Sequence, residues 1–162
     1  MLHEEQNGFR TTRSCQDHIS SLYFLIENRK LNNLDTYTCF VDFKKAFDSI
    51  PRELLWQKLT KERGGRLLTS LKALYTNLYS SVKIKNKLSP PFEVGRGVKQ
   101  GCTLSPILFN IFINDLIGRL KKAAEGIKIR DCKINALLFA DDLVLIAENP
   151  TMLQKLLDAL KE

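Results

Sequence analysis

The sequence predicts an α+β fold in which an antiparallel sheet is backed by helices on one face. Helical and strand-like segments follow one another without the strand–helix–strand repetition that builds a parallel sheet. Two strongly apolar segments are separated only by Asp141 and Asp142, a spacing that is typical of a tight antiparallel hairpin. The length of 162 residues and the 44% hydrophobic content fit one domain, or one well-formed piece of a larger one.

Helices are predicted where apolar residues recur at intervals of three and four, and strands where β-branched and aromatic residues dominate or alternate with polar ones. Pro51 suits the first turn of one helix, Gly64-Gly65 ends it, and Asn149-Pro150 opens the last helix. The predicted helices span residues 14–31, 43–47, 51–63, 67–78, 105–126 and 150–162. The predicted strands span 37–42, 82–85, 92–94, 127–130, 134–140 and 143–147, with 82–85 half-buried and paired with 92–94.

The charge excess favours a polyanionic partner, above all nucleic acid. Lys and Arg total 25 against 18 for Asp and Glu, which gives a net charge of +7. The four cysteines lack the spacing of a zinc site, and reduced intracellular thiols are expected. The N-terminus is unlike a secretion signal, and Asn110, Asn114 and Asp115 interrupt the apolar stretch 106–117. We therefore expect an intracellular protein, nuclear or cytoplasmic, that is neither secreted nor membrane-bound.

Three carboxylates are the strongest indication of chemistry. Asp141 and Asp142 lie between two apolar segments, and Asp42 ends the strand predicted at 37–42. For an isolated Asp-Asp pair a solvated turn is the ordinary interpretation, because aspartate is common in turns. Two aspartates in a hairpin turn nevertheless cost charge repulsion and backbone strain, which a bound cation would offset.

The three carboxylates meet at one sheet edge if the strands that carry them are neighbours. Oxygen-only sites of this kind favour Mg²⁺ over Zn²⁺. Two such ions, about 3.5–4 Å apart, would activate a hydroxyl and stabilise a leaving pyrophosphate. Composition and periodicity permit this arrangement without proving it.

Four motifs in register resemble those of reverse transcriptases, most closely the enzymes of non-LTR (LINE-type) retrotransposons. Phe139-Ala140-Asp141-Asp142 resembles the catalytic hairpin, and residues 40–48 (FVDFKKAFD) resemble the first catalytic motif. Residues 97–106 (GVKQGCTLSP) are similar to the second motif, and residues 6–10 (QNGFR) to a block of the fingers region. The similarity covers nearly the whole chain, and each motif alone would be weak.

The resemblance implies a polymerase palm with a partial fingers region. It also implies that the chain is a fragment of a larger retroelement polyprotein, without a thumb, which polymerises poorly or not at all by itself. The implied divisions are a partial fingers segment at 1–36, the first part of the palm at 37–79, a fingers/palm hairpin with the Gln-Gly loop at 80–104, and the palm helix, catalytic hairpin and final helix at 105–162.

The resemblance implies that Asp42, Asp141 and Asp142 are the catalytic metal ligands. Two Mg²⁺ ions are the implied cofactor, with Mn²⁺ as a substitute, and the carbonyl of Phe43 would complete the shell of one ion. The backbone amides of 43–46 would cradle the triphosphate at the start of a helix. The alternative is that Phe43, Lys44, Lys45 and Ala46 merely begin that helix.

Further roles carried over concern the nucleotide and the primer. Phe47 would lie beneath the incoming sugar and exclude a 2′-hydroxyl; otherwise it is a core phenylalanine. Gln100-Gly101 would face the nucleotide, unless Gly101 is an ordinary loop glycine. Arg10 would meet the triphosphate, although a lone arginine is usually a solvated surface residue. Ala140 would lie near the primer end.

The implied partners are an RNA or DNA template with its primer, and deoxynucleoside triphosphates. Two basic clusters could hold phosphates, and for the second a solvated basic face is an equal alternative. One rival function is a catalytically inactive palm that binds nucleic acid or protein. Another, a palm-fold nucleotide cyclase, is disfavoured because its Gly-Gly-Asp/Glu-Glu-Phe signature is absent. The clusters are Lys83, Lys85, Lys87, Arg96 and Lys99, and Lys121, Lys122, Lys128 and Arg130.

Overall fold

The computed structural model describes residues 2–63, 65–129 and 131–161, which form two compact units. The first unit combines residues 1–44 with 113–162, and the second holds residues 45–112. Helix α5 (Ser105–Ala123) contains the boundary between them. The described residues include no helix of the length and hydrophobicity that a bilayer crossing needs.

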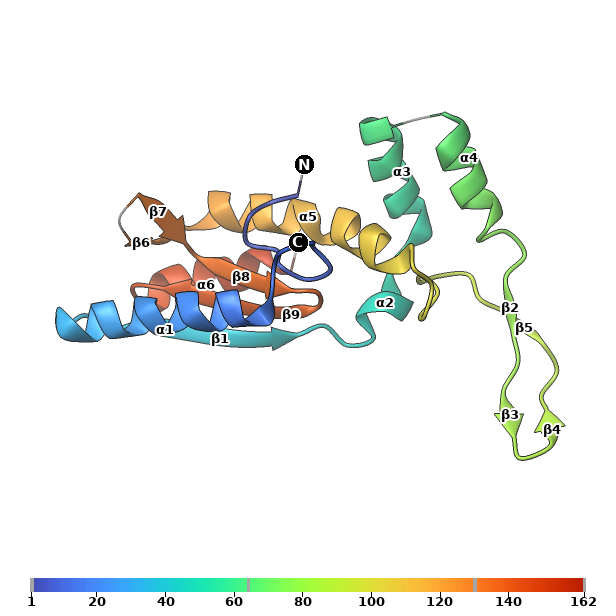
Figure 1. Cartoon of the computed structure of the whole chain (residues 1–162), viewed down its shortest axis with the longest axis horizontal. Helices are drawn as coiled ribbons and strands as arrows, with labels where there is room; N and C mark the ends of the chain where they lie inside the picture. Colours follow the sequence, from blue (N-terminus) through green and yellow to red (C-terminus); the bar gives the residue numbers. More distant parts are fainter. Residues whose placement is uncertain (1, 64, 130, 162) are drawn as a thin grey trace. The chain divides into compact units, whose positions relative to one another are not determined.

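The first unit is built on a three-stranded antiparallel sheet in the order β1-β9-β8 (Figure 1). The α+β class and the antiparallel sheet expected from the sequence are confirmed. Strand β9 is central because its residues 143–147 are all apolar and buried. The elements of this unit, besides the end of α5, are α1 (Cys15–Leu31), β1 (Tyr37–Asp42), β6 (Ile127–Ile129), β7 (Cys132–Ile134), β8 (Ala136–Phe139), β9 (Asp142–Ala147) and α6 (Pro150–Ala159).

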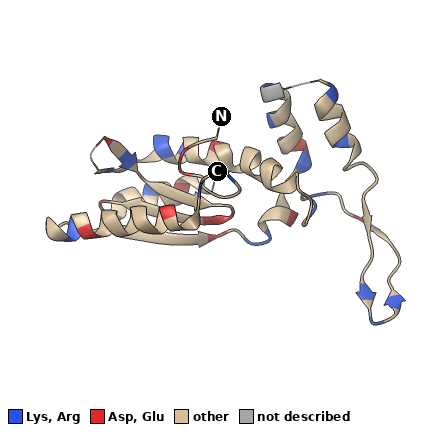
Figure 2. Cartoon of the chain, viewed as in Figure 1, with Lys and Arg blue, Asp and Glu red and all other residues tan. Residues whose placement is uncertain are grey.

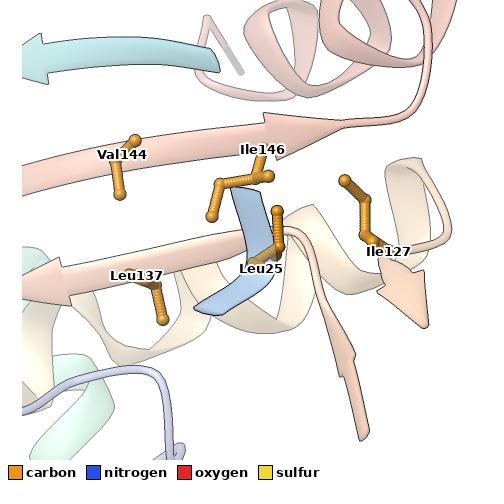
Figure 3. Close-up of a cluster of buried hydrophobic side chains, with 5 residues drawn as sticks. All are labelled: Leu25, Ile127, Leu137, Val144 and Ile146. Carbon is orange, nitrogen blue, oxygen red and sulfur yellow. The ribbon is translucent and has the colours of Figure 1, made fainter. Parts of the chain in front are cut away.

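Both faces of this sheet carry buried side chains, whereas helices on one face alone were expected. Leu137 and Val144 are cross-strand partners and share a face with Ile146, since side chains alternate along a strand. Leu25 of α1 and Ile127 pack against these three (Figure 3). The alternate residues of the same strands, which point to the other face, are also buried: Leu138, Leu143 and Leu145.

Two helices of this unit begin at side-chain caps. The Ser14 hydroxyl accepts from the Asp17 N–H, and the Asp17 carboxylate accepts from the Ser14 N–H, which forms a capping box. Asn149 caps α6 by accepting from the Met152 N–H at 2.8 Å. The helices predicted over 14–31 and from 150 onward are therefore confirmed.

The hairpin of β8 and β9 turns one residue earlier than the sequence suggested. Strand β8 ends at Phe139 and β9 begins at Asp142, so the two-residue loop is Ala140-Asp141. Ala140 has a left-handed φ of 57°, and Asp141 does not. A left-handed φ at the first position only is the pattern of a type II′ turn, not of type I′.

The strand expected over 134–140 is split at Asn135, and an additional hairpin precedes it. Strand β6 pairs with β7 in a separate two-stranded sheet. Asn135 is buried, and its amide donates to the carbonyls of Leu120 and Ala124, both at 2.9 Å. These bonds tie the kink to the end of α5, where the Leu120 carbonyl also accepts from the Ala124 N–H at 3.3 Å. Arg130, expected in β6 and in a basic cluster, lies outside the described residues.

The second unit contains helices and an arm of four short strands within residues 79–93, which we call the β-arm. Helix α4 ends five residues earlier than the predicted limit of 78, because residues 74–77 form turns. Gly64, expected to end α3, lies outside the described residues. The elements, besides the start of α5, are α2 (Ala46–Ser49), α3 (Arg52–Arg63), α4 (Arg66–Ala73), β2 (Tyr79–Ser80), β3 (Lys83–Ile84), β4 (Lys87–Leu88) and β5 (Phe92–Glu93).

The predicted hairpin of the second unit exists with a different pairing and burial. Strand β3 pairs with β4 across a tight turn at Lys85-Asn86, while β5 pairs with β2. Pro90-Pro91 interrupts the outgoing strand, because proline cannot donate to a ladder. All residues of these four strands are exposed, so the expectation of a half-buried strand was wrong.

Candidate active site

The carboxylates expected at one sheet edge are brought together in the first unit. Asp42, the last residue of β1, is the register partner of Asp142, the first residue of β9, and Asp141 directly precedes it. Figure 2 shows acidic residues at the end of β1 and at the β8–β9 turn. Cβ atoms of directly opposed antiparallel residues lie about 4.5–5.5 Å apart. The expectation that the two strands are neighbours is confirmed.

Within the described residues, the side chains of these three aspartates form no ion pair and no hydrogen bond. Asp42 and Asp142 are exposed, and Asp141 is half-buried. Like charges placed opposite each other on neighbouring strands are destabilising. Exposed oxygen ligands without a protein cation fit a hard divalent ion that retains water, which describes Mg²⁺. Among the described residues, no group of three or more His, Cys, Asp or Glu side chains is placed so that it could hold a metal ion.

An apolar hollow of about 370 Å³ lies beside the carboxylates, between α1 and the sheet. Asp42 and Asp142 line it together with Phe40, Phe139 and His18. His18 is half-buried here, and burial lowers the pKa of its imidazole. The sequence held no sign of this position, since His18 belongs to none of the motifs.

The segment after β1 is a turn, not the helix start that the sequence suggested. Lys44 and Lys45 are turn residues, Lys45 has a left-handed φ of 53°, and α2 begins only at Ala46. The Ser49 N–H donates to the Lys45 carbonyl at 2.9 Å, so α2 is little more than one turn. The left-handed residue separates strand and helix, and Phe43 therefore stands outside the helix.

The N-terminal segment lies along β8 and contacts the hairpin turn. Leu138 donates to the Glu5 carbonyl at 2.8 Å and accepts from the Asn7 N–H at 2.9 Å, which makes a short parallel bridge. The Arg10 guanidinium donates to the carbonyls of His3, at 2.9 Å, and Gln6, at 3.0 Å. Its contact with a triphosphate stays a prediction.

In the second unit, Phe47 is stacked on Phe109. The ring centroids are 4.6 Å apart with an interplanar angle of 16°. Phe109 is buried and Phe47 is half-buried, so one face of the Phe47 ring is fixed by the core. The Phe47 carbonyl also accepts from the Val98 N–H at 2.9 Å. The contacts define the ring's position and leave its role as a sugar gate a prediction.

The loop around Gln100-Gly101 packs on α2. Gln100 donates to the Asp48 carboxylate at 3.1 Å. A Cβ on Gly97 would lie 2.7 Å from backbone atoms of Asp48, so glycine permits the close approach. Gly101 has a left-handed φ of 80° and open space around it. Gln100 and Lys99 line a hollow of about 560 Å³ with other basic side chains.

Arg52 holds this loop in place and was missed at the level of sequence. Its guanidinium donates to the carbonyls of Val94 at 2.7 Å, Gly97 at 2.8 Å and Arg96 at 3.1 Å. It also lies 5.0 Å from the centre of the Tyr75 ring, a cation–π contact. Burial lowers the pKa of Arg52. An arginine in the first turn of an amphipathic helix gives no hint of such a role.

The fold is that of a polymerase known from solved structures. The chain superposes on apo telomerase from Candida tropicalis with a TM-score of 0.70 and 17% identity, covering 99% of this chain and 33% of that one. Telomerase from Candida albicans, solved in complex with a fragment of telomeric RNA, gives a TM-score of 0.69 and 13% identity, with 99% and 30% covered. At these identities the likeness establishes the fold.

The family model described as reverse transcriptase (RNA-dependent DNA polymerase) matches residues 1–162, and the chain belongs to this family. A Pol polyprotein of the R2DM retrotransposable element of Drosophila melanogaster is 33% identical over 154 residues, 94% of this chain and 14% of that protein. The R2 polyprotein of Nasonia vitripennis is 30% identical over 155 residues, 95% of this chain and 15% of that one. The resemblance to non-LTR retrotransposon enzymes is confirmed, and the chain spans about one seventh of these relatives.

Proposed function

We propose that the chain is the fingers–palm part of an RNA-directed DNA polymerase that adds deoxynucleotides to a primer 3′-hydroxyl. One observation carries the proposal: in a member of the reverse transcriptase family, Asp42 and Asp142 oppose each other next to Asp141, with no basic partner in the part of the chain that the structure describes. Two divalent ions held there would supply a Lewis acid for the attacking hydroxyl and neutralise the leaving pyrophosphate.

Further residues of the matched motifs would position the phosphates of the substrate. The Phe43 carbonyl, directly after the last residue of β1, would complete the shell of one ion. Backbone amides over 43–46, with Lys44 and Lys45, would bind the triphosphate. Arg10 would add a guanidinium fork, which suits phosphate oxygens.

Other residues would select the nucleotide and place the primer. Phe47, whose ring stacks on Phe109, would exclude a 2′-hydroxyl and so favour deoxynucleotides. Gln100 and Gly101 would face the nucleotide or the template, since the loop presents open backbone there. Ala140 is small enough, at the hairpin turn, to leave room for a primer end.

Incorporation of dTTP on poly(rA)/oligo(dT), with Mg²⁺ or Mn²⁺, tests the proposal. Asp141→Asn is expected to reduce incorporation by a factor of about 10²–10³, because a carboxylate that stabilises transition-state charge is lost. Asp35→Asn, the same change before the other end of β1, serves as the control and should keep wild-type activity. A folded wild-type chain that binds the duplex without incorporating dTTP would support the inactive binding module instead.

The exposed β-arm supplies a contact surface for the nucleic acid. Its tip carries Lys83, Lys85 and Lys87, and residues 79–92 contain no acidic residue. Figure 2 shows Lys and Arg on β3 and β4. The three lysines form no ion pair with any residue that the structure describes. We propose that the β-arm binds template or primer phosphates.

Changing Lys83, Lys85 and Lys87 together to glutamine is expected to weaken single-stranded RNA binding and its salt dependence. Losing three phosphate contacts should reduce the slope of log K against log salt by about 2. Fluorescence anisotropy between 50 and roughly 200 mM salt measures both quantities. The matched triple arginine variant retains the charges and should keep the wild-type slope; an unchanged slope in the glutamine variant would contradict the β-arm contact.

A further inference from the structure

Gln6 binds the turn of the carboxylate hairpin through its side-chain amide. The Ala140 N–H donates to Gln6 Oε1 at 3.0 Å, and Gln6 Nε2 donates to the Ala140 carbonyl at 3.2 Å. The same oxygen accepts from the Gly8 N–H at 2.8 Å. Gln6 is only 1% exposed, so these bonds are formed away from water, where an unpaired amide would be costly.

The turn that Gln6 contacts is unfavourable by itself. Ala140 has a left-handed φ of 57°, a conformation that glycine or asparagine adopts far more readily than alanine. Asp141 and Asp142 follow at once, and Asp142 opposes Asp42. The local sequence therefore opposes the geometry that brings the carboxylates together, and a contact from outside the hairpin must stabilise it.

The segment around Gln6 places its side chain against Ala140. Residues 5–7 are bonded to Leu138 of β8, which fixes the register of Gln6 against the turn. A Cβ on Gly8 would lie 2.2 Å from the Ala140 nitrogen, so glycine allows the backbone to approach. The bonds to Leu138, the side-chain amide of Gln6 and the missing side chain of Gly8 thus all support the contact with Ala140.

We infer that Gln6 is a positioning residue, which holds Ala140 in its left-handed conformation and thereby sets Asp141 and Asp142 for metal binding. The inference rests on the proposed function, in which these aspartates bind the ions. Gln6 touches neither substrate nor metal in this role; it acts through the backbone of the turn.

Amide hydrogen exchange of the 162-residue chain tests the contact without metal or activity. In the wild type the Ala140 amide should be protected. Gln6→Met removes the hydrogen bonds at similar volume and should accelerate Ala140 exchange about tenfold. The Ile146 amide, bonded to the Asn135 carbonyl, should stay protected. Gln16→Met, the same change at an exposed position of α1, is the control.

Divalent-ion binding tests the positioning role. Gln6→Met should raise the Kd for Mn²⁺, measured by electron paramagnetic resonance well below the melting temperature, by roughly tenfold, as losses of supporting contacts to metal ligands do. Gln6→Asn keeps the amide but shortens it, and should act in the same direction if Gln6→Met fails to fold.

The outcomes separate this inference from the proposed function. An unprotected Ala140 amide in the wild type, or one that the folded variants leave unchanged, would overturn the contact. Faster Ala140 exchange with unchanged Mn²⁺ affinity would overturn the positioning role and leave a merely structural one. Failure of Asp141→Asn to weaken Mn²⁺ binding would instead remove the proposed metal site, while the exchange result would still report on the turn.

Discussion

Replacing Asp42 by asparagine is expected to weaken Mn²⁺ binding by at least about tenfold while leaving the metal-free protein as stable as the wild type, or more stable. Asp42 opposes Asp142 across β1 and β9. Cross-strand pairs contribute roughly 0.2–1 kcal/mol, and like charges there are unfavourable. Removing one charge should raise the melting temperature by up to about 4 °C for a chain of this size. Stability in EDTA and Mn²⁺ titration measure the two effects.

A loss of Mn²⁺ affinity together with unchanged or higher metal-free stability would distinguish a binding site from a structural pair of residues. Most substitutions lower stability, so an increase would identify Asp42 as a residue kept for function. Asp35→Asn, an exposed change of the same kind, should leave both quantities unchanged. A marked loss of stability on Asp42→Asn in EDTA would show that the carboxylates do not repel one another and would end the case for a clustered site.

Gly8→Ala is expected to lower the free energy of unfolding by about 3 kcal/mol, at the upper end for overpacking. The new Cβ would lie 2.2 Å from the Ala140 nitrogen and 2.8 Å from its Cα. Both atoms belong to the backbone of the hairpin turn, so no side-chain rotation can relieve the clash. Thermal unfolding should show a decrease of roughly 6–12 °C.

A second glycine provides the matched comparison. Gly118 lies within α5, and a Cβ there would meet only His3 Nε2, at an ordinary 3.5 Å. Gly118→Ala should therefore stabilise the chain by about 0.5–1 kcal/mol, because alanine is the better helix former. Equal melting temperatures for Gly8→Ala and the wild type would mean that the N-terminal segment does not pack against the turn.

The central sheet and its carboxylates could be predicted because they depend on local patterns. Apolar runs define β1, β8 and β9, and two apolar runs two residues apart admit little besides a hairpin. Once β1 and β9 pair, Asp42 and Asp142 are neighbours by register alone. The turn was misplaced by one residue because its stabilising contact comes from Gln6, far away in the sequence.

Arg52, the split at Asn135 and the β-arm pairing could not be predicted for a related reason. Arg52 and Asn135 act through backbone carbonyls of distant segments, and carbonyls carry no sequence signature. In the β-arm the alternation of Ile84 with lysines is typical of a half-buried strand. Ile84 nevertheless pairs with Lys87, in the strand that follows next in the sequence. A short loop closes at lower entropic cost than a long one.

The pairing of β1 with β9 also determines when the carboxylates can meet as the chain is made. Strand β1 ends at residue 42, and its partner begins only at residue 142. A ribosome adding about 5–20 residues per second needs several seconds to cover that interval. Throughout that time Asp42 stands on an unpaired strand, and a nascent or prematurely terminated product lacks the opposing aspartates. The proposed metal site can therefore form only after nearly all of this region has been translated.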